Sequence, residues 1–212
     1  MDEFYTIKQD CQAEITEKKS KFIANLFYVE SKQEAEKIIR ETKKKYNDAR
    51  HNCIAYRIAE DEGILEKQSD DGEPSGTAGS PMLEILKGQN LCNILIIVTR
   101  YFGGILLGTG GLVRAYSDAT IKAIEKADKV NKCIGYLAES EVDYKTIENF
   151  KYYCKNNNIN ISNIEYLDSV ICKIEIENTK KEKLMHDIEN KNINVINFKI
   201  LCKKYINKSV EK

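Results

Sequence analysis

The chain has 212 residues, of which 42% are hydrophobic and 31% are charged, and its 33 Lys and Arg residues balance its 33 Asp and Glu residues. This composition is typical of a globular protein with one large domain or two small ones. The zero net charge argues against binding of nucleic acid that is dominated by electrostatic attraction, although it does not exclude a local basic face. The acidic amino terminus lacks the apolar stretch of a signal peptide, and the longest aliphatic run, residues 94–98, is too short to span a membrane.

Seven cysteines lie far apart in the sequence, and none forms a C-x-x-C pair. Most of them fall in apolar segments, so we expect buried free thiols rather than disulfides or a metal site. Free thiols are typical of a reducing compartment, and we therefore expect a cytoplasmic protein. We predict no bound metal and no cofactor.

The first 130 residues predict strands and helices in mixed order. The expected strands cover residues 4–16, 21–29, 52–59, 64–67 and 93–101, with a turn at 60–63. The expected helices cover residues 32–46, 81–86 and 112–129, the second closed by Gly88. Ser31 and Glu34 form a capping box for the first helix. Ser80 followed by Pro81 predicts the start of the second helix, with Thr77 as an alternative cap.

The strand over residues 93–101 contains the most apolar run of the chain, so we expect it to be central and buried on both faces. Near residue 130 the composition changes, because ten of the eleven glycines and every arginine precede that point. The remaining residues predict a strand, helix, strand, strand, helix and strand over 136–142, 144–156, 159–166, 170–177, 179–190 and 195–205.

This βαββαβ order is that of the ferredoxin-like fold, in which two right-handed βαβ halves share an antiparallel sheet. Asp143 and Thr179 are the expected N-caps of its two helices. The sequence therefore predicts an α+β protein with two domains, at residues 1–132 and 133–212.

Residues 70–119 hold nine of the eleven glycines and both prolines, which is more glycine than ordinary turns need. Within this stretch, a strand that ends near Arg100 is followed by a glycine-rich loop and a helix. The free N–H groups of a helix start favour an anion. We expect Arg114 on the first turn of the helix, where it and Arg100 could hold a phosphate or a carboxylate.

Neither standard nucleotide fingerprint is present, because Thr109 stands where a P-loop needs its lysine and no G-x-G-x-x-G pattern occurs. One alternative is that the glycines serve tight turns and close packing of a strand against a helix, and another is a protein-contact loop. The candidate glycines of this loop are Gly103, Gly104, Gly108, Gly110 and Gly111.

An acidic loop precedes this region, and its oxygen-bearing side chains belong to Asp70, Asp71, Glu73, Ser75 and Thr77. Such ligands suit Mg²⁺ or Ca²⁺, but their spacing is not that of an EF-hand, so we favour a solvated turn. His51 is a candidate general base, with Asp48 or Asp70 to orient it. Asp71 is the other candidate for moving a proton.

Basic and aromatic residues near these loops could contact nucleic acid. Arg50 and Arg57 flank His51, and Tyr101 with Phe102 could stack on bases. Core packing is the commoner fate of such aromatic rings, and Tyr116 has the same two alternatives. We expect the lysines at 43–45 to lie on a solvated helix face and His186 to face solvent.

Four segments resemble the YigZ/Impact family: SKFIA at 20–24, ARHNCIAYR at 49–57, DDGEPSGTAGSP at 70–81 and VTRYFGGILLGTGGLVRAY at 98–116. The resemblance implies an N-terminal domain related to the second domain of ribosomal protein S5 and a ferredoxin-like C-terminal domain similar to one in elongation factor G. Eukaryotic members look like translational regulators that contact a stress-kinase activator with the help of a further N-terminal domain. The resemblance does not imply any catalytic residues in this chain.

Two functions from different classes fit these observations. The first is a non-enzymatic, translation-associated protein that binds RNA, the ribosome or a translation-related protein through the glycine loop and Arg50, His51, Arg57, Arg100, Tyr101 and Arg114. We find no DNA-specific signal and expect no membrane partner. The alternative is an enzyme acting on a nucleotide or phosphorylated small molecule, with phosphate on the glycine loop, Mg²⁺ on the acidic loop, and His51 or Asp71 moving a proton. We favour the binding protein.

Overall fold

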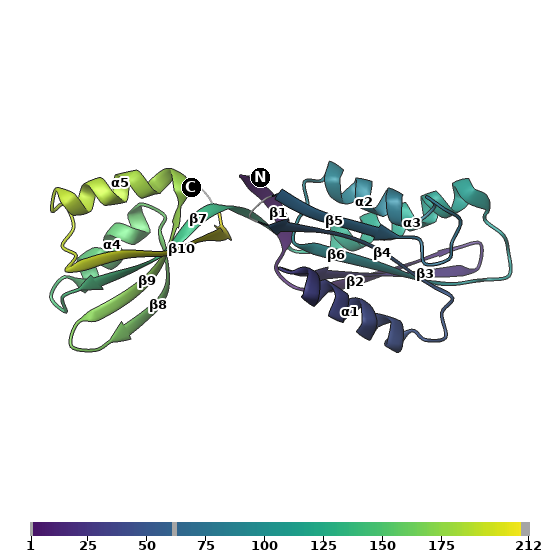
Figure 1. Cartoon of the computed structure of the whole chain (residues 1–212), viewed down its shortest axis with the longest axis horizontal. Coiled ribbons are helices and arrows are strands. Elements are labelled where there is room, and N and C mark those ends of the chain that lie inside the picture. The colour runs from purple at the N-terminus through teal and green to yellow at the C-terminus, as the bar shows by residue number, and fades with distance from the viewer. Residues whose placement is uncertain (1, 61–62, 209–212) are drawn as a thin grey trace. The chain divides into compact units, whose positions relative to one another are not determined.

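The computed structural model describes residues 2–60 and 63–208, and the chain divides into two compact units, one of Glu3–Val130 and one that begins at Asn131. Each unit has its own sheet, helices and hydrophobic core (Figure 1). The predicted α+β class with two units is confirmed. The turn expected at 60–63 includes residues 61 and 62, which lie outside the described residues.

The first unit is built on a five-stranded antiparallel sheet in the order β2-β3-β6-β4-β5. Its strands are β2 (Cys11–Glu17), β3 (Ser20–Tyr28), β4 (His51–Glu60), β5 (Gly63–Ser69) and β6 (Ile94–Tyr101). The central position of β6 and the burial of all its residues before Tyr101 confirm the prediction from its apolar run. A further strand, β1 (Glu3–Ile7), hydrogen-bonds through Tyr5 to Asn90 and Cys92, so the strand expected over 4–16 is two strands.

Two lysines make the turn of the β2–β3 hairpin. Lys18 and Lys19 both have left-handed backbones, with φ of 43° and 65°, and Glu17 pairs with Ser20 across the turn. Two successive residues with positive φ are the mark of a type I′ turn, which matches the twist of the flanking strands. Asn-Gly or Asp-Gly would be the usual sequence there.

Helices cover both faces of this sheet (Figure 1). The helix α1 (Lys32–Lys45) packs on one face, where Ala35 meets Tyr56 and Ile97. The helices α2 (Gly79–Gly88) and α3 (Gly108–Lys126) pack on the other, in a core that includes Phe22, Ile96, Met82 and Tyr116. The start of α3 and the loops that precede α2 and α3, which contain most of the predicted site residues, therefore all belong to the first unit.

The first helix begins as predicted, because the Ser31 hydroxyl accepts a hydrogen bond from the Glu34 N–H at 3.2 Å. The returning bond of the capping box is different, since the Glu34 carboxylate accepts from the N–H of Glu30 at 2.9 Å.

The second helix begins differently from the prediction. It starts at Gly79, and neither Ser80 nor Thr77 caps it. The Thr77 hydroxyl instead donates to the main-chain oxygen of Pro74 at 2.7 Å. Asp70, from well before the helix, accepts hydrogen bonds from the N–H groups of Ala78 and Gly79 at 3.0 and 2.8 Å. A cap from outside the local sequence cannot be found by a search for neighbouring Ser or Thr.

The third helix begins at Gly108, four residues before the predicted start at 112. Arg114 therefore lies in the second turn and not in the first. The prediction treated the glycines as breakers of the helix. Leu107 and Leu112, both buried in the core, anchor this segment, and that tertiary packing outweighs the weak helix propensity of Gly110 and Gly111.

The second unit has the sheet order β10-β7-β9-β8 with every pair antiparallel, which confirms the ferredoxin-like prediction. Its elements are β7 (Lys129–Val142), α4 (Ile147–Asn156), β8 (Asn160–Tyr166), β9 (Val170–Glu177), α5 (Asn178–Glu189) and β10 (Asn197–Asn207). Alternate residues of β9 are buried against Phe150 of α4 and Leu184 of α5, so both helices share one core. His186 is exposed, as predicted.

Both predicted helix caps of this unit are wrong. The Asp143 carboxylate accepts from the N–H of Lys145 at 2.7 Å, but α4 begins only at Ile147. The helix α5 begins at Asn178, one residue before Thr179, and no side chain caps it.

The seven cysteines, all within the described residues, form no disulfide, and all but Cys202 are buried or half-buried, as predicted for the thiols. No helix within 2–60 and 63–208 combines the length and apolar character needed to cross a membrane.

Candidate functional site

Strand pairing brings several predicted residues to one end of the first sheet. Phe22 of β3, Arg100 of β6 and His51 of β4 are opposite one another in the register of the three strands. Four connections meet at this end, and we call them together the loop end: residues 18–19, 46–50, 70–78 and 102–107. The question is which of their side chains remain available to a ligand.

The first carboxylate of the acidic loop, Asp70, is fully engaged by main-chain groups. Besides the two N–H groups that begin α2, it accepts from the N–H of Gly76 at 2.9 Å. Burial alone would raise the pKa of Asp70, but these three hydrogen bonds outweigh it and hold the pKa below its usual value. Asp70 therefore organises the loop and the start of α2, and does not orient His51.

Asp71 is also engaged. Its two carboxylate oxygens accept from the N–H of Asn52 at 2.7 Å and from the ammonium of Lys43 at 2.5 Å. His51 Nδ1 lies 2.9 Å from the main-chain oxygen of Asp71. A carbonyl oxygen can only accept, so Nδ1 carries the ring proton and only Nε2 has a lone pair to offer.

The third carboxylate, Glu73, is buried with its partners. One oxygen accepts from the Arg100 guanidinium at 2.7 Å and from the Tyr116 hydroxyl at 2.8 Å. Arg100 is itself buried, with its guanidinium carbon 5.5 Å from the centre of the Phe22 ring and 5.6 Å from that of Phe102. This ion pair joins the acidic loop to the end of β6 and to α3.

Cys53 adds a thiol to the same network, donating to the main-chain oxygen of Asp70 at 3.0 Å. Burial raises the pKa of Cys53 to about 12 despite a hydrogen bond with Tyr116. Burial likewise raises the pKa of the Tyr116 hydroxyl far above its usual value. Both groups stay protonated at neutral pH, so neither is a ready nucleophile or base. Tyr116 packs in the core and cannot stack on a base.

The remaining oxygen donors of the acidic loop do not add a metal site. Ser75 is exposed at the tip of the loop, and Thr77 is buried. Among residues 2–60 and 63–208, no three His, Cys, Asp or Glu side chains are grouped so that they could hold a metal ion.

The glycines of the loop end serve different purposes. A Cβ on Gly103 would lie only 2.0 Å from the main-chain carbon of Lys19, so Gly103 allows the chain to pass against the hairpin turn. Gly104 and Gly108 have left-handed backbones, with φ of 85° and 72°, in open space. A Cβ on Gly110 would meet nothing within 4 Å. Close packing thus accounts for Gly103 but not for Gly110.

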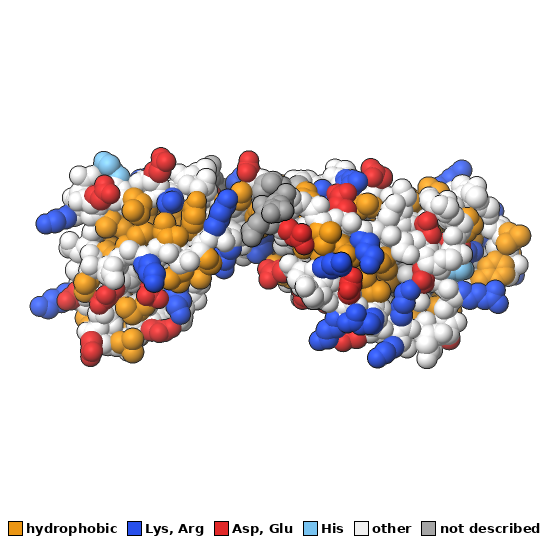
Figure 2. Space-filling model, in the orientation of Figure 1, with side chains coloured by type: hydrophobic (Ala, Val, Ile, Leu, Met, Phe, Trp, Pro, Cys, Tyr) orange, Lys and Arg blue, Asp and Glu red, His pale blue; other side chains and the backbone are white. Residues whose placement is uncertain are grey.

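Several groups of the loop end remain exposed. Arg50 is exposed, as are Phe102 (51%), Ile105 and Leu106 (84%) at the tip of the loop before α3. Figure 2 shows hydrophobic side chains gathered at this end of the first unit, beside Lys and Arg. Tyr101 is half-buried, and its hydroxyl donates to Asp48 at 2.8 Å. That hydrogen bond raises the pKa of Tyr101.

A groove of about 350 Å³ runs beside this tip, between β2 and α3. Of the predicted site residues, only Gly111 and Arg114 line it, together with Lys18 and Leu107. Arg100 is engaged elsewhere, by Glu73, so the two arginines do not form the joint anion clamp that the sequence suggested.

Arg57 lies away from the loop end. It is buried, donates to Glu66 at 2.9 Å, and donates to the main-chain oxygen of Leu91 at 2.9 Å. Its role is to tie β4 to β5 and to the segment after α2. The exposed Ile105 and Leu106, in contrast, were not singled out from the sequence, although two successive aliphatic residues between glycines were a readable signal.

Comparison with known proteins gives this architecture a family. Residues 18–124 match the Impact N-terminal domain, and residues 141–191 match a domain of unknown function, DUF1949. The chain is 39% identical over 167 residues to the IMPACT family member YvyE of Bacillus subtilis, covering 79% of this chain and 76% of that protein. The chain belongs to the IMPACT family.

Relatives from eukaryotes share only part of this IMPACT-family chain. The protein IMPACT homolog of Dictyostelium discoideum is 45% identical over 97 residues, which is 44% of this chain and 28% of that protein. A crystal structure of a hypothetical protein matches nearly the whole fold, with 29% identity, 92% of this chain and 97% of that chain covered, and a TM-score of 0.62.

Proposed function

We propose that this IMPACT-family chain is a translation-associated, non-enzymatic binding protein that contacts RNA, the ribosome or a translation-related protein through the loop end of its first unit. The family supports the translational context, because its eukaryotic members resemble translational regulators. The shared region includes the loop end, since residues 18–124 match the Impact N-terminal domain.

One observation carries the proposal. All three carboxylates of the acidic loop, Asp70, Asp71 and Glu73, are engaged within the unit. Cations outnumber carboxylates among the charged groups that remain exposed around the loop end: Lys18, Lys19, Lys44, Lys45, Arg50 and Arg114 against Glu17, Asp48 and Asp118. Cations beside an exposed apolar tip suit a partner that presents negative charge and a non-polar or aromatic surface.

The enzyme alternative has no comparable support among the described residues. It needs free carboxylates for Mg²⁺ and a free base, but the carboxylates accept hydrogen bonds inside the loop. His51, whose Nδ1 donates to a main-chain oxygen, keeps a lone pair on Nε2 as a base, but the described residues contain no group of ligands for the metal that this alternative requires. The carboxylates that were candidates for chemistry instead hold the loop together.

The test removes Arg50, an exposed cation of the loop end, and Arg114, which lines the groove beside it, in an Arg50→Ala/Arg114→Ala variant. We expect weaker co-sedimentation with ribosomes or weaker binding of ribosomal RNA, and a slope of log affinity against log salt that is less steep by about 2, one for each lost cation. A Lys32→Ala/Arg40→Ala variant removes the same charge from exposed positions of α1 and is the matched control. Binding that falls equally in both variants, or in neither, would contradict the proposal.

A second variant distinguishes a protein partner from RNA. Leu106→Ser removes the most exposed apolar side chain of the tip without changing charge. A protein partner should lose affinity in this variant with little change in salt dependence, whereas RNA held by its phosphates should bind as before. Unchanged melting temperatures of all variants show that folding is intact.

A further inference from the structure

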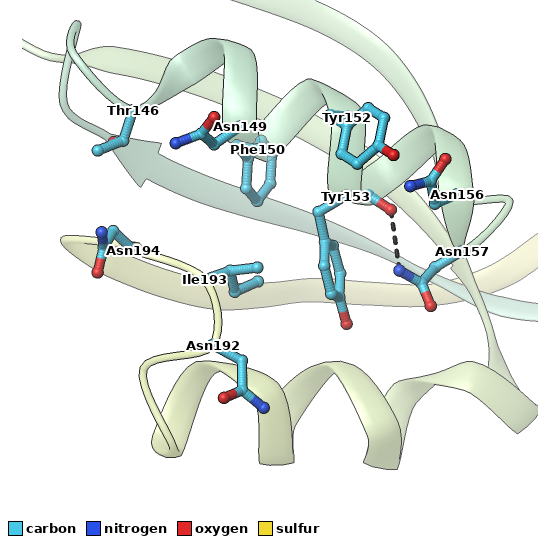
Figure 3. Close-up of a pocket in the computed structure, with 10 residues that line it drawn as sticks. All are labelled: Thr146, Asn149, Phe150, Tyr152, Tyr153, Asn156, Asn157, Asn192, Ile193 and Asn194. Atoms are coloured by element: carbon cyan, nitrogen blue, oxygen red, sulfur yellow. Dashed lines mark hydrogen bonds between the residues drawn. The ribbon is translucent and has the colours of Figure 1, made fainter.

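The second unit contains a cavity of about 310 Å³ between α4 and the segment that follows α5 (Figure 3). Five of its ten lining residues are asparagines, and no Lys, Arg, Asp or Glu is among the described residues that line it. Its size falls at the lower end of the range for small-molecule sites. A cavity lined by amides rather than charges favours an uncharged group with several hydrogen-bonding atoms, which can be one part of a larger ligand.

The amide groups lie on both sides of this cavity. Figure 3 shows Asn149 and Asn156 on α4, with Asn192 and Asn194 on the facing segment. Asn192 is held in place, because its Nδ2 donates to Asp187 at 2.9 Å. Asn149, Asn156 and Asn194 have no partner within the described part of the chain, so their donors and acceptors are open to a ligand.

Aromatic rings complete the site. Tyr153 reaches from α4 toward α5 (Figure 3). Its hydroxyl donates to Asp187 of α5 at 2.6 Å. The same carboxylate thus fixes Tyr153 and Asn192. Tyr152, next along α4, is 68% exposed at the rim. An exposed ring beside amides that each offer a donor and an acceptor is suited to a planar heterocycle, which can stack and hydrogen-bond at once.

A second hollow of about 220 Å³ adjoins the first and shares Tyr153, Asn156 and Asn157 with it. It is lined by Lys180 and Lys183. The Lys180 ammonium forms an ion pair with Glu177 at 2.8 Å. The Lys183 ammonium instead donates to the neutral amide oxygen of Asn157 at 2.7 Å, which leaves further N–H donors, and Asp187 is the carboxylate that its charge influences.

We propose that this double cavity is a nucleotide-binding site, with the base among the amides and Tyr152 and the phosphate on Lys183. The neighbouring lysine distinguishes a nucleotide from a neutral sugar, which would also accept amide and aromatic contacts. The site lies within the second unit and goes beyond the function proposed for the loop end. The nucleotide can be a free mononucleotide or one residue of a single-stranded RNA.

The experiment separates these two sources. The full chain is titrated by calorimetry with AMP, GMP, CMP and UMP, with the matching nucleosides, and with short single-stranded RNA. RNA titrations use the Arg50→Ala/Arg114→Ala background, so that RNA held by the loop end does not hide the cavity. Saturable binding of a mononucleotide supports a free ligand, and much tighter binding of RNA supports an RNA residue. No saturation by either at millimolar concentration overturns the proposal.

Three variants locate the binding. Tyr152→Ala should weaken it about fivefold or more, the effect of losing one stacked base, and Asn156→Ala should weaken it as well. Lys183→Gln should weaken binding of a monophosphate but not of its nucleoside. Tyr166→Ala and Asn163→Ala remove exposed side chains of β8 and are the matched controls. Equal losses in the controls, or a Lys183→Gln effect that is the same for nucleoside and nucleotide, overturn the proposal.

Discussion

The acidic loop of the first unit and the amide cavity of the second are both rich in polar side chains, but they use them in opposite ways. In the acidic loop, Asp70, Asp71 and Glu73 each accept at least two hydrogen bonds from the same unit. In the cavity, Asn149, Asn156 and Asn194 face open space. The acidic loop is the more noticeable stretch in the sequence. The cavity nevertheless has more side-chain donors and acceptors that remain available to a ligand.

The difference teaches that an unusual polar sequence can specify a structure rather than a reaction. Buried polar groups must be paired, because an unpaired one costs free energy. A loop that carries carboxylates into the interior therefore needs partners that are also specific, such as Arg100 and Tyr116. Exposed amides have no such requirement, so their gathering around a cavity is better evidence of a ligand.

The largest effect should come from breaking the buried pair. Glu73→Ala leaves the Arg100 charge and the Tyr116 hydroxyl buried without their acceptor, and we expect a loss of about 3–5 kcal/mol in the free energy of unfolding. Urea denaturation measures it. Glu84→Ala, which removes an exposed ion pair with Lys87, is the matched control and should change stability by less than about 1 kcal/mol. A small loss in Glu73→Ala would mean that this network does not hold the loop.

A somewhat smaller effect is expected at the distant helix cap. Asp70→Asn weakens three charge-assisted hydrogen bonds, including those to the start of α2, and should cost about 2–3 kcal/mol at neutral pH. The pKa of Asp70 is lowered in the folded state. The carboxylate therefore stabilises the fold above its usual pKa of about 3.9, and this contribution is lost as the pH falls through the folded-state pKa.

The pH dependence tests this cap directly. The difference in unfolding free energy between Asp70→Asn and the parent should be largest near neutral pH and should shrink in acid. Chemical denaturation at a series of pH values measures the difference. A gap that stays constant into acid would contradict the assignment of Asp70 as an ionised cap.

The smallest effects compare a glycine of the loop before α3, Gly103, with a glycine in the first turn of α3, Gly110. Gly103→Ala forces a Cβ against the main chain of Lys19 and should cost about 1–3 kcal/mol. Gly110→Ala meets nothing and lies in a helix, where alanine is favoured over glycine by up to about 1 kcal/mol. Melting temperatures of the two variants measure the contrast. Equal changes in the two variants would contradict the assignment of Gly103 to close packing.

Much of the fold could be predicted from local patterns. The apolar run of β6 indicated a central strand, and the βαββαβ order of the second unit indicated its sheet topology. Both predictions rest on where apolar residues occur along the chain, and burial determines those positions. The starts of α2 and α3 could not be predicted in this way. Asp70 caps α2 from outside its local sequence, and α3 extends through glycines because its leucines are buried.

The candidate site was harder to predict than the fold. The sequence placed His51 and Arg100 near the ends of two strands, but the pairing of those strands, which sets the two residues opposite each other, is seen only in the structure. The sequence could not show that Arg57 and Arg100 are buried in ion pairs, because pairing with Glu66 and Glu73 depends on tertiary contacts. The cavity escaped notice because its asparagines come from two segments separated by a strand pair and a helix.

The hairpin turn at Lys18 and Lys19 has a consequence for the evolution of this sequence. Two lysines occupy backbone conformations that asparagine and glycine adopt with less strain. Mutations that relieve this strain would be accessible whenever greater heat resistance is favoured. Each would also remove a positive charge from the loop end. The turn would therefore couple adaptation to temperature with the partner binding that we propose for the loop end, so that selection on one property changes the other.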